Sequence, residues 1–331
     1  SMKLPKCQDR LIEEVLKVQP NVVVVLHNGS PVELPWADRV SAILEMYLGG
    51  QGVGEACDRL LFGEANPSGR LAETFPYRLE DNPSFLHFPG NGKRVLYGED
   101  IFVGYRYYDT KKVPVRYAFG HGLSYTEFAY GDLNLSSAQM TDEDILTVSF
   151  KVKNTGKTEG KEVVQLYVAD LCGISERPVK ELKGFAKVHL LPGEEKTVSM
   201  EISARNLSYY EERLGDWYAP SGTYRILIGH ASDDIRLHAD IVFETKKKLP
   251  LRVDFTTTFG ELLDHTKTAP VITELLAPLA AAAASAEGMS DEYKKLGEQV
   301  IREMPLKFLL GQMPGEQVEQ LIGQLNCLLA Q

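Results

Sequence analysis

The fold of the first third of the chain is decided by the stretch Asn21-Val-Val-Val-Val-Leu26. This β-branched run has no polar alternation, which is typical of a strand buried on both faces of a parallel sheet. Residues 11–18 before it have apolar positions at helical spacing, residues 40–46 after it predict a second strand, and residues 54–62 predict a short helix. The order helix, strand, strand, helix indicates an open α/β sheet. Two strands are too few for such a sheet, so we expect it to be incomplete at its N-terminal side.

The middle of the chain changes its pattern twice. Residues 66–126 are rich in Gly, Pro and aromatic residues, which predicts a long ordered excursion packed on another surface. From about residue 133 to residue 244, apolar and polar residues alternate in short runs, at 146–153, 163–168, 196–202 and 224–228. Short alternating strands separated by Asn, Gly and Pro turns predict an immunoglobulin-like β-sandwich.

The last part of the chain is expected to be helical. A basic, Pro-containing stretch predicts a linker at 246–254, and helical patterns follow at 259–263, 271–286, 291–304 and 315–329. The predicted division is therefore 1–130 for an α/β/α portion, 131–245 for the β-sandwich, 246–254 for the linker and 255–331 for a helical extension. The fold class is multidomain, with an α/β part, an all-β part and a small helical appendage.

Composition limits the classes of function. The 331 residues are 44% hydrophobic and 25% charged, as in folded globular proteins, and the net charge of −10 disfavours nucleic-acid binding. No run approaches the length of a membrane span, and no signal peptide is recognised. The four cysteines at 7, 57, 172 and 327 lack metal-site spacing, so we expect free thiols and a cytoplasmic location.

No set of residues forms a catalytic group by itself. The glycine cluster at 49–54 does not meet dinucleotide-loop spacing, and the seven histidines lack metal-ligand spacing, so neither a cofactor nor a metal is predicted. Glu99 and Asp100 could hold a sugar hydroxyl, or form a salt bridge with Arg106 that fixes their loop. The two tryptophans could stack on sugars. We expect instead that Trp217 fills the sandwich and that Trp36 caps a strand end.

Five motifs, in this order along the chain, resemble those of a known protein family. They are Val22-Val-Val-Val-Leu-His-Asn-Gly-Ser-Pro-Val-Glu-Leu-Pro-Trp36, Gly49–Gly54, Leu61-Phe-Gly-Glu-Ala-Asn-Pro-Ser-Gly-Arg-Leu-Ala-Glu-Thr-Phe-Pro76, Tyr97-Gly-Glu-Asp-Ile-Phe-Val-Gly-Tyr-Arg-Tyr-Tyr-Asp109 and Phe119-Gly-His-Gly-Leu-Ser-Tyr125. Together they resemble glycoside hydrolase family 3. The segments 160–168, 177–185 and 191–194 resemble the fibronectin type III-like domain that ends many of these enzymes, and the helical tail resembles an extension in some bacterial members.

The resemblance implies that the catalytic machinery lies elsewhere. In this family the nucleophile is an Asp of an N-terminal (β/α)8 barrel, and the general acid/base is a Glu whose loop precedes the positions matched by Leu4, Pro5 and Gln8. We therefore expect both carboxylates upstream and no catalytic residue in this chain. Segments 97–109 and 119–125 are expected to pack against the barrel, with Glu99, Tyr105 and Arg106 holding the two domains together.

Two functions from different classes follow. In the first, the chain is the C-terminal, non-nucleophile-bearing part of a retaining, exo-acting β-glucosidase of the bacterial cytoplasm, inactive alone, whose partners are the barrel portion and a glycoside substrate. Members of the family also cleave β-xylosides, α-L-arabinosides and N-acetylglucosaminides, so the resemblance does not fix the sugar that is hydrolysed. The sequence does not fix the oligomeric state either. In the second, the chain is a stand-alone carbohydrate-binding or interaction module. An exposed apolar strand edge disfavours the second reading.

Overall fold

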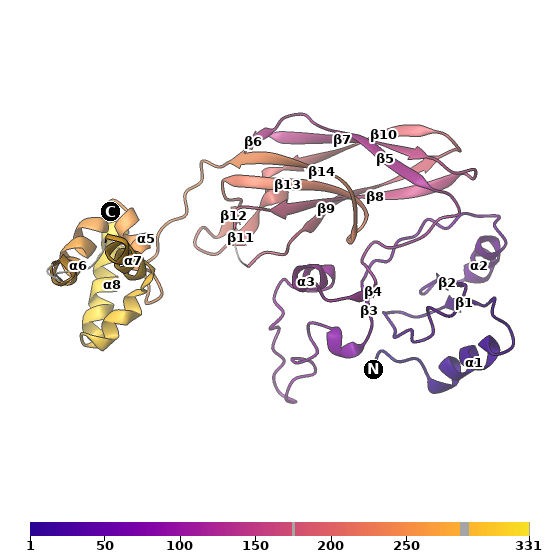
Figure 1. Ribbon diagram of the computed structural model, residues 1–331, viewed down its shortest axis with the longest axis horizontal. Coiled ribbons are helices and arrows are strands. Elements are labelled where there is room, and N and C mark those ends of the chain that lie inside the picture. Colours follow the sequence, from indigo (N-terminus) through magenta and orange to yellow (C-terminus); the bar gives the residue numbers. More distant parts are fainter. Residues whose placement is uncertain (174–175, 285–290, 331) are drawn as a thin grey trace. The chain divides into compact units, whose positions relative to one another are not determined.

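The computed structural model describes residues 1–173, 176–284 and 291–330 (Figure 1). The chain separates into two compact units, and each is described by itself. The first unit contains Ser1–Tyr209 and Trp217–Lys246, and the second contains Tyr210–Asp216 and the residues from Lys247 onward. The α/β portion and the β-sandwich thus belong to one compact unit, while the predicted boundary between them near residue 130 stays a prediction.

The N-terminal elements occur in the predicted order. They are α1 (Lys6–Leu16), β1 (Val23–Leu26), β2 (Ala42–Glu45) and α2 (Val53–Leu61). The two strands pair in parallel, which confirms the prediction from their apolar runs. Among the strands that the structure describes, β1 and β2 have only each other as neighbours. The sheet is therefore incomplete, as the sequence predicted for its N-terminal side, and within the described residues the outer edge of β2 also has no ladder partner.

A small core holds this sheet to its surroundings. Trp36 is fully buried and packs in one cluster with Leu26, Leu34 and Phe75. Its indole N–H donates to Asp9 of α1 at 2.9 Å, so the buried ring still has a partner for its polar atom. Trp36 is therefore a core residue that also anchors α1, rather than a cap on a strand end.

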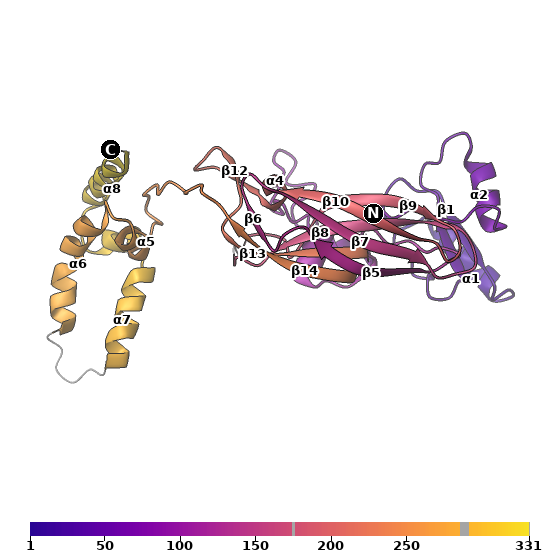
Figure 2. The ribbon, with the colours of Figure 1, turned by 90° about the horizontal axis from the view of Figure 1, so that it is seen from above.

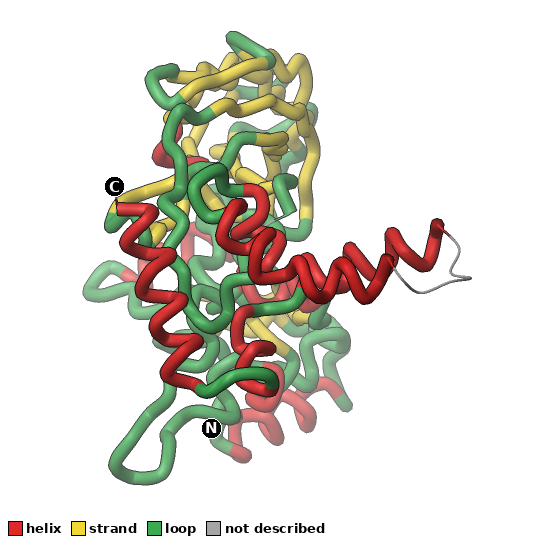
Figure 3. The backbone as a smooth tube through the Cα atoms, turned by 90° about the vertical axis from the view of Figure 1, so that its left-hand side faces the viewer, coloured by secondary structure: helices red, strands yellow, loops and turns green. Residues whose placement is uncertain are grey.

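The excursion after α2 is mostly irregular, with a few short regular elements. Figure 3 draws all loops and turns of the chain in green. The regular elements of the excursion are β3 (Phe75–Pro76), η1 (Leu79–Asp81), α3 (Tyr105–Lys111) and β4 (Val115–Tyr117). The antiparallel pair β3–β4 closes the excursion back on itself. Periodicity did not predict α3, because a helix of seven residues is too short to show a repeating apolar face.

The β-sandwich has two sheets, drawn together in Figure 1. One contains β10 (Glu195–Ser203), β7 (Ile145–Asn154) and β5 (Phe128–Leu135) in that order. The other contains β6 (Gln139–Thr141), β14 (Asp234–Glu244), β13 (Gly222–Ala231), β8 (Gly160–Asp170) and β9 (Glu181–Leu190) in that order. All pairs are antiparallel except β6–β14. The short elements α4 (Ala204–Leu207), β11 (Tyr209–Glu211) and β12 (Asp216–Tyr218) complete the region.

Alternating side chains from both sheets form the sandwich core. Val148, Phe150 and Val152 of β7 meet Leu166 of β8 and Ile226 of β13, all buried. Strand β8 differs from β7, since its residues are buried on both faces over much of its length. The second face of β8 is covered by the α/β portion, which makes this strand the centre of the junction described below.

One expectation for the sandwich was wrong. Trp217 does not fill its core: the side chain is 38% exposed and the Arg205 guanidinium lies 3.1 Å from its ring centroid. The cause is its position in β12, a three-residue strand outside the two large sheets, where a ring has no inward face to occupy. A cation stacked on the indole supplies part of the cover that burial would give.

The second unit is helical, as predicted (Figure 2). Its elements are α5 (Phe259–Asp264), α6 (Ala269–Ala284), α7 (Asp291–Glu303), η2 (Leu306–Gly311) and α8 (Gly315–Ala330). Thr258 and Glu261 form a capping box at the start of α5. A separate core joins these helices, and its buried residues include Phe259, Ile272 and Leu306. Residues 285 and 286, predicted to be helical, lie outside the described residues, and no described helix could cross a membrane.

Candidate functional site

Helix α3 carries two of the three predicted residues, and both face the sandwich. The Tyr105 hydroxyl accepts the backbone N–H of Leu182, in β9, at 2.7 Å. Its ring stacks on Phe119 with centroids 4.8 Å apart and meets the edge of Tyr167, in β8, at 5.9 Å. Burial raises the pKa of the Tyr105 hydroxyl, so it is neutral at physiological pH. Tyr105 therefore joins α3 to the outer face of the five-stranded sheet.

Arg106 pairs with an acidic residue of β9 rather than with its neighbours in the loop. Its Nη2 lies 3.3 Å from Oε1 of Glu181, whose Oε2 accepts from Arg177 at 3.0 Å. Burial would raise the pKa of Glu181, but Lys183, Arg177 and Arg106 outweigh it and hold that pKa below its ordinary value. The expected ion pair of Arg106 with the 99–100 carboxylates is thus replaced by a pair with the sandwich.

Glu99 is separate from the other two predicted residues. One of its carboxylate oxygens, Oε2, is buried and has no hydrogen-bond partner among the described residues. The structure thus brings Tyr105 and Arg106 together at β9 and leaves Glu99 outside this contact. The role of all three in holding a barrel domain stays a prediction, and the contacts seen for Tyr105 and Arg106 are internal to this chain.

Two further contacts at the same junction escaped the sequence analysis. Asp109 pairs with Lys180 at 2.7 Å, and the Thr110 hydroxyl accepts the backbone N–H of Val179 at 3.1 Å. Both link α3 to the segment leading into β9. The charged segment Arg177–Phe185 is the sequence signal for these contacts, because several charged side chains close together need oppositely charged partners.

A buried ion cluster closes one end of the sandwich. Glu162 of β8 is fully buried and lies within 2.6 Å of Arg70, which comes from the excursion after α2. The other oxygen of Glu162 accepts from the Tyr130 hydroxyl at 2.6 Å and lies 2.5 Å from Nδ1 of His230. Buried charges of this kind need partners, and both oxygens of Glu162 have them, whereas Nε of Arg70 is buried without a hydrogen-bond partner among the described residues. The cluster attaches the segment around Arg70 to three strands.

The loop that follows β4 is bound to the outer face of β8. Gln165 donates from Nε2 to the carbonyls of Gly120 and His230, and its Oε1 accepts from the Tyr167 hydroxyl at 2.6 Å. Gly120 has φ +83°, and a Cβ there would lie 2.2 Å from Gln165 Oε1. Only glycine fits this close approach with that backbone conformation.

The carboxyl ends of β1 and β2 gather a second group of polar residues. Burial raises the pKa of Glu45, at the end of β2, and that of Glu73 nearby. Burial, with the two negative charges, raises the pKa of Tyr47 to about 12. Buried oxygen atoms of Glu45, Tyr47 and Asn28 have no hydrogen-bond partner among the described residues. In open α/β sheets, ligands approach the carboxyl ends of parallel strands, so this edge is a candidate ligand-facing edge of the sheet.

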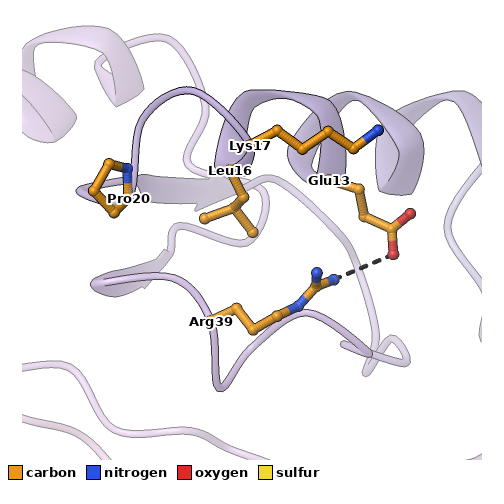
Figure 4. A pocket seen from close by; sticks show the side chains of 5 residues that line it. All are labelled: Glu13, Leu16, Lys17, Pro20 and Arg39. Carbon is orange, nitrogen blue, oxygen red and sulfur yellow. Dashed lines mark hydrogen bonds and ion pairs between the residues drawn. The ribbon is translucent and has the colours of Figure 1, made fainter.

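The surface hollow beside α1 does not have the features of a catalytic or metal-binding site. An open hollow of about 350 Å³ lies beside α1, lined by Glu13, Leu16, Lys17, Pro20 and Arg39, and Glu13 is neutralised there by Arg39 at 3.2 Å (Figure 4). It offers no second carboxylate for acid/base chemistry. The described residues contain no group of three or more His, Cys, Asp or Glu placed to hold a metal ion.

With this arrangement in place, comparison with known proteins identifies the class. Residues 1–125 match the glycosyl hydrolase family 3 C-terminal domain, and residues 162–232 match the fibronectin type III-like domain. The chain therefore carries the C-terminal portion of a glycoside hydrolase family 3 protein, with an α/β domain followed by a β-sandwich.

The similar proteins are much longer than this chain. Thermostable beta-glucosidase B of Acetivibrio thermocellus is 46% identical over 329 residues, which is 98% of this chain and 43% of that protein. A beta-glucosidase of Kluyveromyces marxianus is 47% identical over 237 residues, or 71% of this chain and 28% of that protein. The chain thus spans less than half the length of these relatives.

The solved structures that resemble this chain are also beta-glucosidases. The GH3 beta-glucosidase of Bifidobacterium adolescentis is 38% identical with a TM-score of 0.75, and the match covers 82% of this chain and 40% of that one. The Kluyveromyces marxianus enzyme, crystallised in complex with glucose, is 43% identical with a TM-score of 0.69, covering 73% of this chain and 29% of that one. Over the matched 73–82% of the chain, the fold is therefore shared with beta-glucosidases of known structure.

Proposed function

We propose that this chain is the C-terminal, non-nucleophile-bearing part of a retaining, exo-acting β-glucosidase that hydrolyses terminal β-D-glucosyl residues. The observation that carries the proposal is the 46% identity to a beta-glucosidase over 98% of the chain. A retaining glycosidase needs two carboxyl groups about 5–5.5 Å apart across the scissile bond. In this proposal both come from the portion of the enzyme that this chain does not span.

The unpaired sheet supports a covalent or tightly bound partner. Strands of parallel sheets are normally buried between neighbours and under helices. Here β1 and β2 have no further neighbour among the described strands, and Val23 of β1 is 48% exposed. Additional strands from the remainder of the enzyme would cover the apolar edge, and they would bring its catalytic loops to the ends of β1 and β2.

The excursion supplies a second surface for that partner. Large apolar side chains are exposed in residues 85–103 of the excursion, where a soluble protein would normally bury them. They are Phe85, Leu86, Phe88, Val95, Leu96, Tyr97, Ile101 and Val103. We infer that the (β/α)8 barrel of the same enzyme covers this surface. Glu99 has a buried carboxylate oxygen without a hydrogen-bond partner among the described residues, and we infer that it receives a donor from the barrel.

Reconstitution in two pieces tests the proposal. The portion of the Acetivibrio thermocellus enzyme that this chain does not match would be expressed separately and mixed with this chain. We expect hydrolysis of 4-nitrophenyl β-D-glucoside by the mixture but not by this chain alone, with slowed amide exchange in residues 22–26 and 85–103. The same assay with a β-xyloside, an α-L-arabinoside and an N-acetylglucosaminide tests the sugar specificity of the mixture.

A matched pair of variants makes the test specific. Val23→Lys places a charge on the strand edge that should be covered, and Val242→Lys places one at a similarly exposed position of β14. We expect the first to abolish reconstitution and the second to preserve it. Equal behaviour of the two variants would refute the predicted edge. Sugar binding by this chain alone, with no effect of the second piece, would favour a stand-alone binding module instead.

A further inference from the structure

The sequence contains two Asn-Gly pairs, Asn28-Gly29 and Asn91-Gly92. In such a pair the backbone nitrogen of the glycine can attack the side-chain amide carbon of the asparagine, because glycine has no Cβ to obstruct a close approach. Neither glycine N–H donates a hydrogen bond to another described residue, so both nitrogens are available. The surroundings of each asparagine side chain therefore decide which pair reacts.

Asn91 lies at an exposed loop tip of the excursion, and two backbone donors face its side-chain oxygen. Oδ1 accepts the N–H of Arg94 at 3.2 Å and, at the longer distance of 3.5 Å, that of Lys93. The N–H of Asn91 donates in return to the carbonyl of Arg94 at 3.2 Å. Gly92, with φ +85°, turns the chain between them. The Asn91 side chain is therefore folded over the peptide that carries the Gly92 nitrogen.

The donors at Oδ1 meet the charge that the attack creates. When a base removes the Gly92 amide proton and the nitrogen bonds to Cγ of Asn91, negative charge develops on Oδ1. N–H groups already directed at that oxygen stabilise such an oxyanion. The Cγ–Nδ2 bond then breaks, and Nδ2 takes up a proton and leaves as ammonia, so that a cyclic imide remains. Water opens the imide at either carbonyl, which gives aspartate or isoaspartate.

We propose that Asn91 is a site of spontaneous modification, at which attack by the Gly92 nitrogen and hydrolysis replace the side-chain amide by a carboxylate. The product adds a negative charge next to Lys93 and Arg94, and its isoaspartate form inserts an extra carbon into the backbone of the turn. The modified turn lies within the exposed apolar segment 85–103. This inference does not depend on the proposed glucosidase function.

The other pair, Asn28-Gly29, has surroundings that oppose the same reaction. Nδ2 of Asn28 donates to the carbonyl of Ser30 at 2.8 Å, which holds the nitrogen that would have to leave. Its Oδ1 is buried and has no donor among the described residues, so the oxyanion would be unsupported. A new carboxylate would also form at a half-buried position beside Glu45. We therefore expect Asn28 to react more slowly than Asn91.

Peptide mapping of the intact chain tests the proposal. The chain would be kept folded in mildly alkaline buffer, sampled over time and digested with trypsin, and electron-transfer fragmentation would distinguish aspartate from isoaspartate at each site. Because two hydrogen bonds support Oδ1 of Asn91 and none supports that of Asn28, we expect Asn91 to convert at least about fivefold faster. Equal conversion of the two sites, or faster conversion of Asn28, would overturn the proposal.

Unfolding the chain in urea separates the structure from the sequence. Urea removes the hydrogen bonds around both side chains but keeps the two Asn-Gly pairs, so we expect the two rates to become similar. The result that contradicts the proposal is an Asn91 that stays unmodified in the folded chain while it converts in urea. The comparison needs no substitution, so it stands even where a variant does not fold.

A matched pair of glycine variants identifies the attacking nitrogen. Gly92→Ala adds a methyl group beside that nitrogen, and Gly63→Ala makes the same change elsewhere. Both glycines have positive φ, at +85° and +78°, and at neither would a Cβ meet a heavy atom within 4 Å. We expect Gly92→Ala to slow conversion of Asn91 and Gly63→Ala to leave it at the wild-type rate. Conversion of Asn91 at the wild-type rate in Gly92→Ala would refute attack by this nitrogen.

Discussion

Removing the Tyr105 hydroxyl isolates one contact of the junction between α3 and β9. Tyr105→Phe keeps the ring that stacks on Phe119 but deletes the acceptor of the Leu182 backbone N–H. A buried donor left without a partner costs about 1–3 kcal/mol. In amide exchange, that cost corresponds to about 5–150-fold faster exchange for amides that open together with this junction. We expect the increase in β9 and α3, and no change in the helical unit.

The control for this prediction is the same chemical change at an exposed site. Tyr97 is 83% exposed, so Tyr97→Phe should leave exchange in β9 and α3 within error of the wild type. Hydrogen exchange followed by mass spectrometry reads both variants by segment and avoids assuming a single unfolding transition for a chain with two compact units. Unchanged exchange in β9 of Tyr105→Phe would refute the role assigned to this hydroxyl.

Three other substitutions test separate parts of the account. Leu166→Ala empties a fully buried position of the sandwich core and should lower the free energy of unfolding by about 2–5 kcal/mol in urea titrations. Glu181→Gln removes a carboxyl whose pKa lies below its ordinary 4.5, so the wild type should exceed the variant in stability at pH 7 and lose that advantage as pH falls below about 4.5. Gly120→Ala should destabilise more than Gly63→Ala, because both glycines have positive φ but only the former meets Gln165, and equal urea midpoints would contradict this.

Much of the fold follows from local patterns. The unbroken run at 22–26 predicted a parallel strand buried on both faces. Strand β1 pairs in parallel with β2, but only Leu26 is buried and Val23 is 48% exposed, because β1 has no second neighbouring strand among the described residues. The period-two runs predicted the strands of the sandwich, because one face of β7 meets a core and the other meets solvent. Helical spacing likewise predicted α1, α2 and the C-terminal helices. For the sandwich strands and the helices, the cause is a periodic contrast between a buried and an exposed face, which the sequence contains directly.

The contacts at the junction could not be predicted in this way. Whether Arg106 pairs with Glu99 or with Glu181 depends on how two segments that are distant in the sequence meet in the fold. Arg106 lies on the short helix α3 and contacts Glu181 of β9, so its neighbours in the sequence did not predict its partner. Glu162 appears in the sequence as one polar residue in a strand, and its importance arises only when Arg70 and His230 reach it. Trp217 was misassigned because its strand lies outside the large sheets.

The central claim is that this chain serves as the C-terminal part of a β-glucosidase, and a chimaera tests it most directly. In the Acetivibrio thermocellus enzyme, the 43% of the protein that matches this chain would be replaced by residues 1–331. The account predicts that the purified chimaera releases glucose from 4-nitrophenyl β-D-glucoside, while the enzyme lacking that portion does not. A chimaera that folds with the sandwich and sheet protected from exchange, yet hydrolyses no β-glucoside, would contradict the claim.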